Sequence, residues 1–180
     1  MTHSLLISIF CPDRTGLVSS ITGTLFNLGV NLGDTTFAVL GSGAEFTAVC
    51  DSPINSNDIE SHLRALPDLN GADIKITPFD LSKIHGPNAL ITHYITLRGA
   101  DHPGLIAQLT EVLMAFEANI VRLNAETIPN QEEKEYLINL SVSIPQSRID
   151  ACLASISNTA STLAMHCDFQ TVCINESIIN

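Results

Sequence analysis

Apolar residues form strand-like runs and helix-like stripes along the chain. Residues 5–10 are a mostly apolar run that predicts a central strand, and apolar side chains at positions 17, 21, 25 and 28 predict an amphipathic helix. Strands over 31–40 and 45–50 should follow, joined by a glycine-rich turn. A second helix carries Ile59, Leu63 and Leu66, with Asn57 or Asp58 as its cap, and residues 74–77 form a last strand. The predicted order of the first half is β-α-β-β-α-β.

The second half repeats that order. We predict strands over 90–98, 119–128, 135–144 and 165–174, a helix with Pro103 in its first turn, and a helix over 149–163. The βαββαβ order is that of a ferredoxin-like sandwich, in which two helices lie on one face of a four-stranded antiparallel sheet. The predicted fold class is therefore α+β. The opposite face of each sheet needs a cover, so a duplicated or dimeric arrangement is expected.

An internal repeat supports two domains of one kind. At an offset of 88 residues, and without a gap, six positions coincide: Asp13/Asp101, Gly16/Gly104, Leu17/Leu105, Thr22/Thr110, Leu25/Leu113 and Asn31/Asn119. A period near 90 residues is too long for a solenoid and suits a duplicated small domain. We predict domains over residues 1–82 and 89–180, with a Gly-Pro-punctuated linker over 83–88.

Composition and charge narrow the classes of function. The 180 residues are 45% hydrophobic, which excludes an intrinsically disordered chain, and 8 Lys and Arg against 19 Asp and Glu give a net charge of −11. Scattered basic residues in an acidic chain argue against direct binding to nucleic acid or to an anionic membrane. Since neither a leader nor an apolar run of membrane-spanning length is visible, we expect a soluble cytoplasmic protein.

The cysteines predict no disulfide framework. They are odd in number and lack C-x-x-C spacing: Cys11, Cys50, Cys152, Cys167 and Cys173. We therefore expect buried free thiols in a protein of a reducing compartment. A metal site around His166 and Cys167 is possible but disfavoured, because adjacent residues on a strand face opposite ways. We therefore expect neither a metal nor a cofactor.

The turn between the first strand and helix of each half carries the candidate chemistry. It offers a carboxylate, which can accept from an ammonium group, beside a helix N-terminus, which favours a carboxylate ligand. An asparagine eighteen residues further on supplies a donor and an acceptor. A small zwitterion needs this combination. The candidate ligand-binding residues are Asp13, Arg14, Thr15, Gly16, Leu17 and Asn31 in the first half and Asp101, His102, Pro103, Gly104, Leu105 and Asn119 in the second.

The same residues also admit a purely structural interpretation. An aspartate before a helix is an ordinary cap, a glycine there can serve helix-on-sheet packing, and asparagine tolerates turn geometry. The spacing leaves both interpretations open.

The D-x-x-G-L turn followed by Asn, at the head of a βαββαβ unit, resembles the ACT domain, a small amino-acid-sensing module. The stretch from Asn31 to Gly41, followed by Glu45-Phe46, resembles the glycine cleavage system transcriptional repressor family, which consists of two ACT domains. The resemblance implies amino-acid sites near domain interfaces, lined by Asp13, Gly16 and Asn31 and by their counterparts in the second half. It also implies a repressor that contacts a DNA-binding activator, with glycine releasing the restraint. Serine is a second candidate ligand.

Two other functions stay open. A Cys-His enzyme would use Cys11 and His102, but the two halves do not share these residues at equivalent positions, so catalysis is disfavoured. A ligand-free interaction module would keep the turns for packing only. We predict a non-catalytic, amino-acid-responsive regulator that acts through protein contacts, with homodimerisation also possible.

Overall fold

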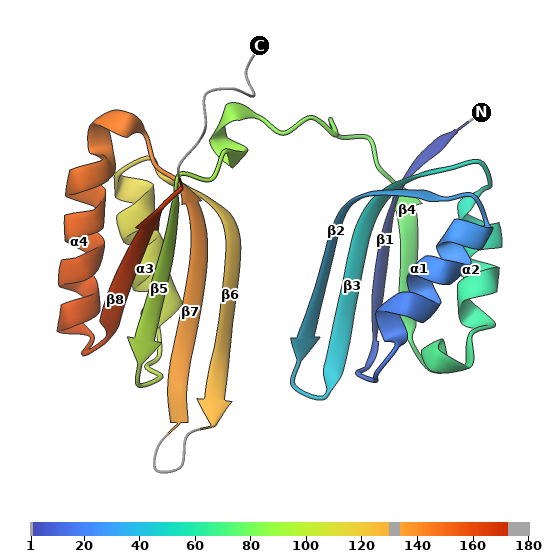
Figure 1. The fold of residues 1–180 in the computed structure, drawn as a ribbon, viewed down its shortest axis with the longest axis horizontal. Coiled ribbons are helices and arrows are strands. Elements are labelled where there is room, and N and C mark those ends of the chain that lie inside the picture. Colours follow the sequence, from blue (N-terminus) through green and yellow to red (C-terminus); the bar gives the residue numbers. More distant parts are fainter. Residues whose placement is uncertain (1, 130–133, 173–180) are drawn as a thin grey trace. The chain divides into compact units, whose positions relative to one another are not determined.

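The computed structural model describes residues 2–129 and 134–172. The chain divides into two compact units, Met1–Ser82 and Lys83–Asn180, each with the order β-α-β-β-α-β and with both helices on one face of its sheet (Figure 1). The predicted α+β class with tandem ferredoxin-like domains is confirmed. Residues 83–88 fall within the second unit, and their role as a linker stays a prediction.

The first unit has a four-stranded antiparallel sheet in the order β2-β3-β1-β4. A short 3₁₀ turn, Pro67–Leu69, precedes its last strand. The elements are β1 (His3–Pro12), α1 (Leu17–Asn27), β2 (Asn31–Leu40), β3 (Gly43–Ser52), α2 (Ser56–Arg64) and β4 (Asp73–Pro78).

The second unit repeats this topology in the order β6-β7-β5-β8. Two 3₁₀ turns, Pro87–Ala89 and Gln146–Arg148, precede β5 and α4. The elements are β5 (His93–Gly99), α3 (Leu105–Ala115), β6 (Asn119–Pro129), β7 (Lys134–Ser143), α4 (Ile149–Thr162) and β8 (His166–Thr171).

Each unit has its own hydrophobic core between sheet and helices. In β1 every second side chain is buried, and Leu17, Ile21 and Leu25 of α1 face them. In the second unit Leu105, Leu109 and Leu113 of α3 pack in the same way. Burying one such side chain contributes about 1.5–3 kcal/mol to the free energy of unfolding. The alternation of buried residues along the strand and the buried stripe along the helix therefore account for the packing of helix on sheet.

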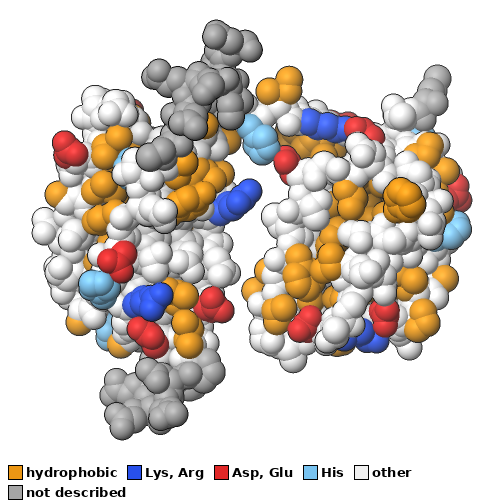
Figure 2. All heavy atoms as spheres, viewed as in Figure 1, with side chains coloured by type: hydrophobic (Ala, Val, Ile, Leu, Met, Phe, Trp, Pro, Cys, Tyr) orange, Lys and Arg blue, Asp and Glu red, His pale blue; other side chains and the backbone are white. Residues whose placement is uncertain are grey.

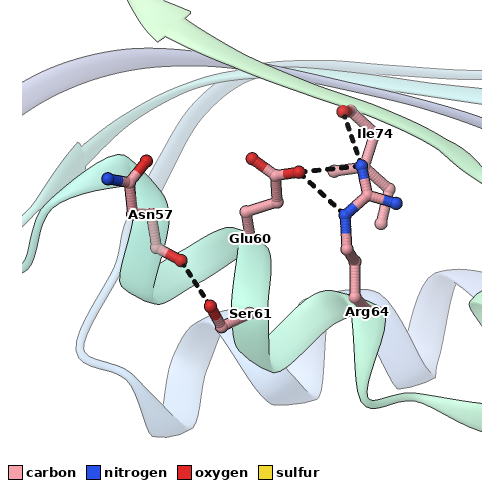
Figure 3. A network of polar contacts seen from close by, with 5 residues as sticks. All are labelled: Asn57, Glu60, Ser61, Arg64 and Ile74. Carbon is pink, nitrogen blue, oxygen red and sulfur yellow. Dashed lines mark hydrogen bonds and ion pairs between the residues drawn. The ribbon is translucent and has the colours of Figure 1, made fainter.

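A small polar network ties α2 to the edge strand β4 (Figure 3). The Arg64 guanidinium pairs with the Glu60 carboxylate at 2.7 Å and also donates to the Ile74 carbonyl of β4 at 3.4 Å. The Ser61 hydroxyl donates to the Asn57 carbonyl one turn back along the helix. A helix residue thus supplies a hydrogen bond to the strand beside which it packs.

Three predicted element ends are wrong, each for a local reason. The cap of α2 is Asn55, whose side chain accepts from the Asp58 N–H at 3.0 Å, so the predicted Asn57 and Asp58 lie inside the helix. Helix α3 begins at Leu105, which leaves Pro103 in the preceding turn. Strand β5 begins at His93, because residues 87–90 are used by a 3₁₀ turn.

Helices α1, α3 and α4 are each followed by a residue in the left-handed region. Gly29 follows α1 with φ 75°, and its N–H donates to Phe26 O while Val30 N–H donates to Leu25 O. This is a Schellman motif, which favours glycine. Glu117 after α3 (φ 57°) and Ala164 after α4 (φ 53°) occupy the same position without being glycine. Both therefore carry local backbone strain.

The outer strands β2 and β6 each carry one β-bulge near the start. The register with the neighbouring strand shifts between Leu32 and Thr35 in β2 and between Ile120 and Arg122 in β6. A bulge bends a strand and increases its twist. The fold therefore bends both edge strands just after Asn31 and Asn119.

Basic side chains are few on the face shown in Figure 2, in keeping with the 8 Lys and Arg of the chain. Within the described ranges, no helix is long and apolar enough to cross a membrane.

Candidate ligand-binding site

The turn before the first helix has the same backbone in both units. After β1, the Asp13 N–H donates to Ser42 O at 2.9 Å, and the Leu17 N–H donates to Arg14 O at 3.3 Å. In the second unit the Leu105 N–H donates to His102 O at 3.2 Å. The repeated sequence thus forms a repeated turn.

The glycines of these turns are required by backbone conformation. Gly16 and Gly104 are the N-cap residues of α1 and α3, with φ 87° and 82°, in the left-handed region that glycine adopts without strain. A β-carbon on Gly16 would meet nothing within 4 Å, and one on Gly104 would meet only the Gln108 amide at 3.9 Å. The interpretation that these glycines permit close packing is therefore wrong.

The aspartates do not cap the helices. The N-cap residues are glycines and provide no side-chain bond, so the interpretation of Asp13 as an ordinary cap is also wrong. Asp13 and Asp101 are exposed, and in the described part of the chain neither carboxylate has a hydrogen-bond or ion-pair partner. Both are free to accept from a ligand.

Of the remaining turn residues, two belong to the hydrophobic cores, three are exposed, and one forms an ion pair. Leu17 and Leu105 are only 2% exposed, so their side chains belong to the cores. Thr15, His102 and Pro103 are exposed. The Arg14 guanidinium lies 3.4 Å from the Asp68 carboxylate, which also accepts from Ser20 Oγ at 2.7 Å. Sequence reasoning missed Asp68, because fifty-four residues separate it from Arg14 along the chain.

Asn31 and Asn119 do not lie in these turns but at the start of the outer strands β2 and β6. In each unit the asparagine lines a hollow between the C-terminal half of the first helix and the beginning of that outer strand. The first hollow is about 480 Å³ and is lined by Ser19, Thr22, Gly23, Phe26, Val30, Asn31 and Leu32. The second is about 410 Å³ and is lined by Asn88, Thr110, Leu113, Met114, Glu117, Ala118, Asn119 and Ile120.

These hollows contain residues that the sequence analysis did not select. Thr22 and Thr110 are equivalent, as are Phe26 and Met114, whose side chains are 79% and 72% exposed. The identity of the two threonines at the offset of 88 was a visible signal. The exposure of Phe26 could not be inferred, because its place on the helix is also compatible with a half-buried side chain.

The structure does not bring the aspartate and the asparagine of one unit together. They lie at opposite ends of an 11-residue helix, which is about 16 Å long. Glycine is shorter than one helical turn of about 5.4 Å. One small amino acid therefore cannot contact both groups of the same unit.

The thiols lack the environment of a nucleophile. Cys11 is 3% exposed, and burial is the main cause that raises its pKa, against a smaller lowering effect of Arg14. Burial also raises the pKa of Cys152, and burial followed by the charge of Asp168 raises the pKa of Cys167 to about 11. A catalytic cysteine needs the opposite shift, because the thiolate is the reactive form. Cys173 lies outside the described residues.

In residues 2–129 and 134–172, no group of three or more His, Cys, Asp or Glu residues lies close enough together to hold a metal ion. His166 pairs with Asp168 at 3.2 Å, and both side chains are largely exposed.

Comparison with known proteins supplies the family. The ACT domain model matches residues 3–77 and again residues 93–170, which together make up most of the chain. The chain belongs to the ACT domain family. Its similarity to glycine cleavage system transcriptional repressors is also confirmed: those of Escherichia coli K12 and Shigella flexneri are each 29% identical over 142 residues, 78% of this chain and 73% of theirs.

Solved structures agree on the fold of the ACT protein. An unknown protein from Galdieria sulphuraria has a TM-score of 0.73 at 23% identity, covering 96% of this chain and 99% of its own. A protein provisionally assigned as a glycine cleavage system transcriptional repressor has a TM-score of 0.65 at 16% identity, covering 96% and 98%. At these identities the likeness concerns the fold.

Proposed function

We propose that this tandem ACT protein is a non-catalytic cytoplasmic regulator that binds a small amino acid, glycine foremost and serine next, and controls a protein partner by contact. The observation that carries the proposal is the turn formed twice with one backbone geometry, each time with an exposed Asp13 or Asp101 carboxylate that has no partner among the described residues. The similarity to proteins named glycine cleavage system transcriptional repressors supports a regulatory role connected with glycine. Glycine as the signal and a DNA-binding activator as the partner are part of the proposal.

The turn of each unit offers groups that can bind the two charged ends of an amino acid. The ammonium group donates to the aspartate carboxylate, while the carboxylate approaches the N–H groups at the start of α1 or α3. Asn31 and Asn119 lie too far along the helix to assist in the same unit. Each turn must therefore be completed by groups from outside its own unit, or must bind weakly.

A regulator of this kind works by linkage. An amino acid that binds one state of the protein better than another shifts the population toward that state, and the affinity for the partner changes by the same coupling free energy. A Cys-His enzyme is disfavoured, because Cys11 is buried and burial raises the pKa of its thiol. A ligand-free interaction module is the second candidate, favoured by the exposed side chains of Phe26 and Met114.

A thermal-unfolding scan of the full chain against the twenty amino acids tests the proposal. A ligand at about 100 times its Kd stabilises by roughly 2.7 kcal/mol, which raises Tm by about 5–10 °C in a protein of this size. We expect the shift with glycine or serine, and its reduction in Asp13→Ala and Asp101→Ala. Asp80→Ala, an equal change of charge outside the turns, is the control. A flat response in folded protein would favour the ligand-free module.

A further inference from the structure

One face of each sheet has no helix of its own unit over it in the described parts of the chain. Both helices lie on the other side, so every second side chain of a strand is left on the uncovered face (Figure 1). In the first unit these side chains include Leu6, Val49 and Phe10, which is 49% exposed. In the second unit Tyr94 is 42% exposed on the corresponding face. Exposed apolar side chains on a sheet face mark a place where a further layer can pack.

On the uncovered face of the first unit, an aromatic ring stands between two carboxylates. The strand register pairs Phe10 of β1 with Glu45 of β3 on one side and with Asp73 of β4 on the other, and all three are exposed. The ring lies against Gly43, where a β-carbon would come within 2.6 Å of it. Phe10, Gly43 and Asp73 border a hollow of about 340 Å³. An aromatic ring beside carboxylates is a favourable environment for a guanidinium group.

The same row of the second unit carries a positive charge instead. At the offset of 88 residues Phe10 corresponds to Arg98, which the register pairs with Leu137 of β7 and with His166 of β8. The Arg98 side chain is exposed and has no hydrogen-bond or ion-pair partner in the described ranges. The Asp73 carboxylate has none among the same residues. One framework therefore presents an unused carboxylate in one unit and an unused guanidinium in the other.

The acidic side chains near Arg98 do not engage it. Asp168 lies two residues from His166 on β8 and pairs with that ring at 3.2 Å. Glu126 of β6 lies beyond Leu137 in the register, one strand further from Arg98. The guanidinium is therefore available to a carboxylate outside its own unit.

We propose that the uncovered sheet faces join two copies of this chain, with Arg98 of each copy seated in the hollow beside Phe10 and Asp73 of the other. A first-unit face packs on a second-unit face, and a twofold axis makes the contact twice. The guanidinium donates to the Asp73 carboxylate and lies against the Phe10 ring, a combination that suits arginine in interfaces. The proposal does not depend on amino-acid binding.

The area of the faces matches that of a stable dimer. Each sheet has four strands, and the last strand of each has 6 residues. With strands about 4.8 Å apart and a rise of about 3.3 Å per residue, one face measures about 400 Å². A contact made twice covers four faces, or about 1,600 Å², and specific interfaces bury about 1,200–2,000 Å². Two sheets pack face to face in this way in β-sandwiches.

Sedimentation velocity of the full chain at increasing concentration is the first test. We expect a dimer with a Kd of about micromolar or tighter. Asp73→Lys and Arg98→Glu should each raise that Kd at least about 30-fold, because each places like charges together at both contacts. Glu111→Lys, an equal charge reversal at an exposed position of α3, is the matched control and should leave Kd unchanged. A chain that stays monomeric, or equal effects of Asp73→Lys and the control, would overturn the proposal.

Mixing the two charge-reversed variants is the second test. In a mixed dimer one contact keeps the original pair of Arg98 and Asp73, and the other joins the introduced lysine to the introduced glutamate. Both contacts are then complementary, so the mixture should dimerise with a Kd within about fivefold of the unaltered chain. Recovery also shows that both variants are folded. A contact made within one chain cannot be restored by mixing, so absence of recovery would overturn the proposal.

Discussion

Replacing Gly16 by alanine tests why the turn between β1 and α1, the candidate ligand-binding turn, contains glycine. The residue has φ 87°, and a β-carbon there would meet nothing within 4 Å. The substitution therefore introduces no steric overlap with neighbours and changes only the cost of the local conformation. An L-residue in the left-handed region costs about 1–2 kcal/mol. Alanine also lowers the conformational entropy of the unfolded chain, which stabilises the folded protein by about 0.4–1 kcal/mol. The expected net destabilisation is about 1 kcal/mol.

Gly23 provides a matched control seven residues further along α1. It too has open space around a β-carbon, but it lies in the helix interior and has no positive φ. Gly23→Ala should therefore stabilise by about 0.5–1 kcal/mol, because glycine in a helix interior is unfavourable relative to alanine. The two substitutions are chemically identical and should have opposite signs. Gly104→Ala in the second unit should behave like Gly16→Ala, since its φ is 82°.

Urea and thermal unfolding of the three variants give the comparison. About 1 kcal/mol shifts Tm by roughly 4–8 °C in a domain of 60–100 residues, and the first unit spans residues 1–82. We expect Gly16→Ala and Gly104→Ala to lower Tm and Gly23→Ala to raise it. A stabilising or neutral effect of Gly16→Ala would show that the left-handed turn is not part of the folded state in solution, and the reasoning about the site would then fail.

Three further predictions follow from buried or strained groups. Ala164→Gly should stabilise the second unit by about 0.5–1 kcal/mol in urea unfolding, because φ 53° strains alanine and not glycine. Burial lowers the pKa of His93 below its usual 6.5, so the unfolded chain takes up this proton more readily than the folded chain. The free energy of unfolding should therefore be highest above pH 6.5 and should fall as the pH drops below that value. His93→Leu, which installs the residue of the matching position Leu5, should flatten that pH dependence. Cys11 should react with a thiol reagent only after unfolding, because it is 3% exposed with a raised pKa; rapid reaction of the native chain would contradict its buried position.

The helices and strands could be predicted well because their periodicities are clear. The stripe Leu17, Ile21, Leu25 is buried as expected, and so is the alternation of β1. The ends were harder to predict. Asn55, Asn57 and Asp58 are all good capping residues, and the choice of Asn55 depends on where the chain leaves β3. The bulges in β2 and β6 left no signal, because a single unpaired residue in a strand does not change the composition.

The site was predicted as a set of residues but not as a geometry. The turn residues and the asparagines are repeated in the sequence, and their separation could have been inferred from the length of the predicted helix between them. The hydrogen bond from Asn119 to Asn88 could not, because it joins residues 31 positions apart that no periodicity relates. The role of these residues in ligand binding stays a prediction until a ligand is tested.

The bulges in β2 and β6 also bear on the tendency of this protein to aggregate at high concentration. Within the described residues both strands lie at the edge of their sheets, so their outer N–H and C=O groups have no strand beside them in their own unit. A straight edge of this kind is a template for strand-by-strand aggregation, and a bulge interrupts the regular spacing of donors and acceptors. Removing the extra residue from β2 would straighten the edge and should shorten the lag time of fibril formation under partly denaturing conditions, even if stability increased.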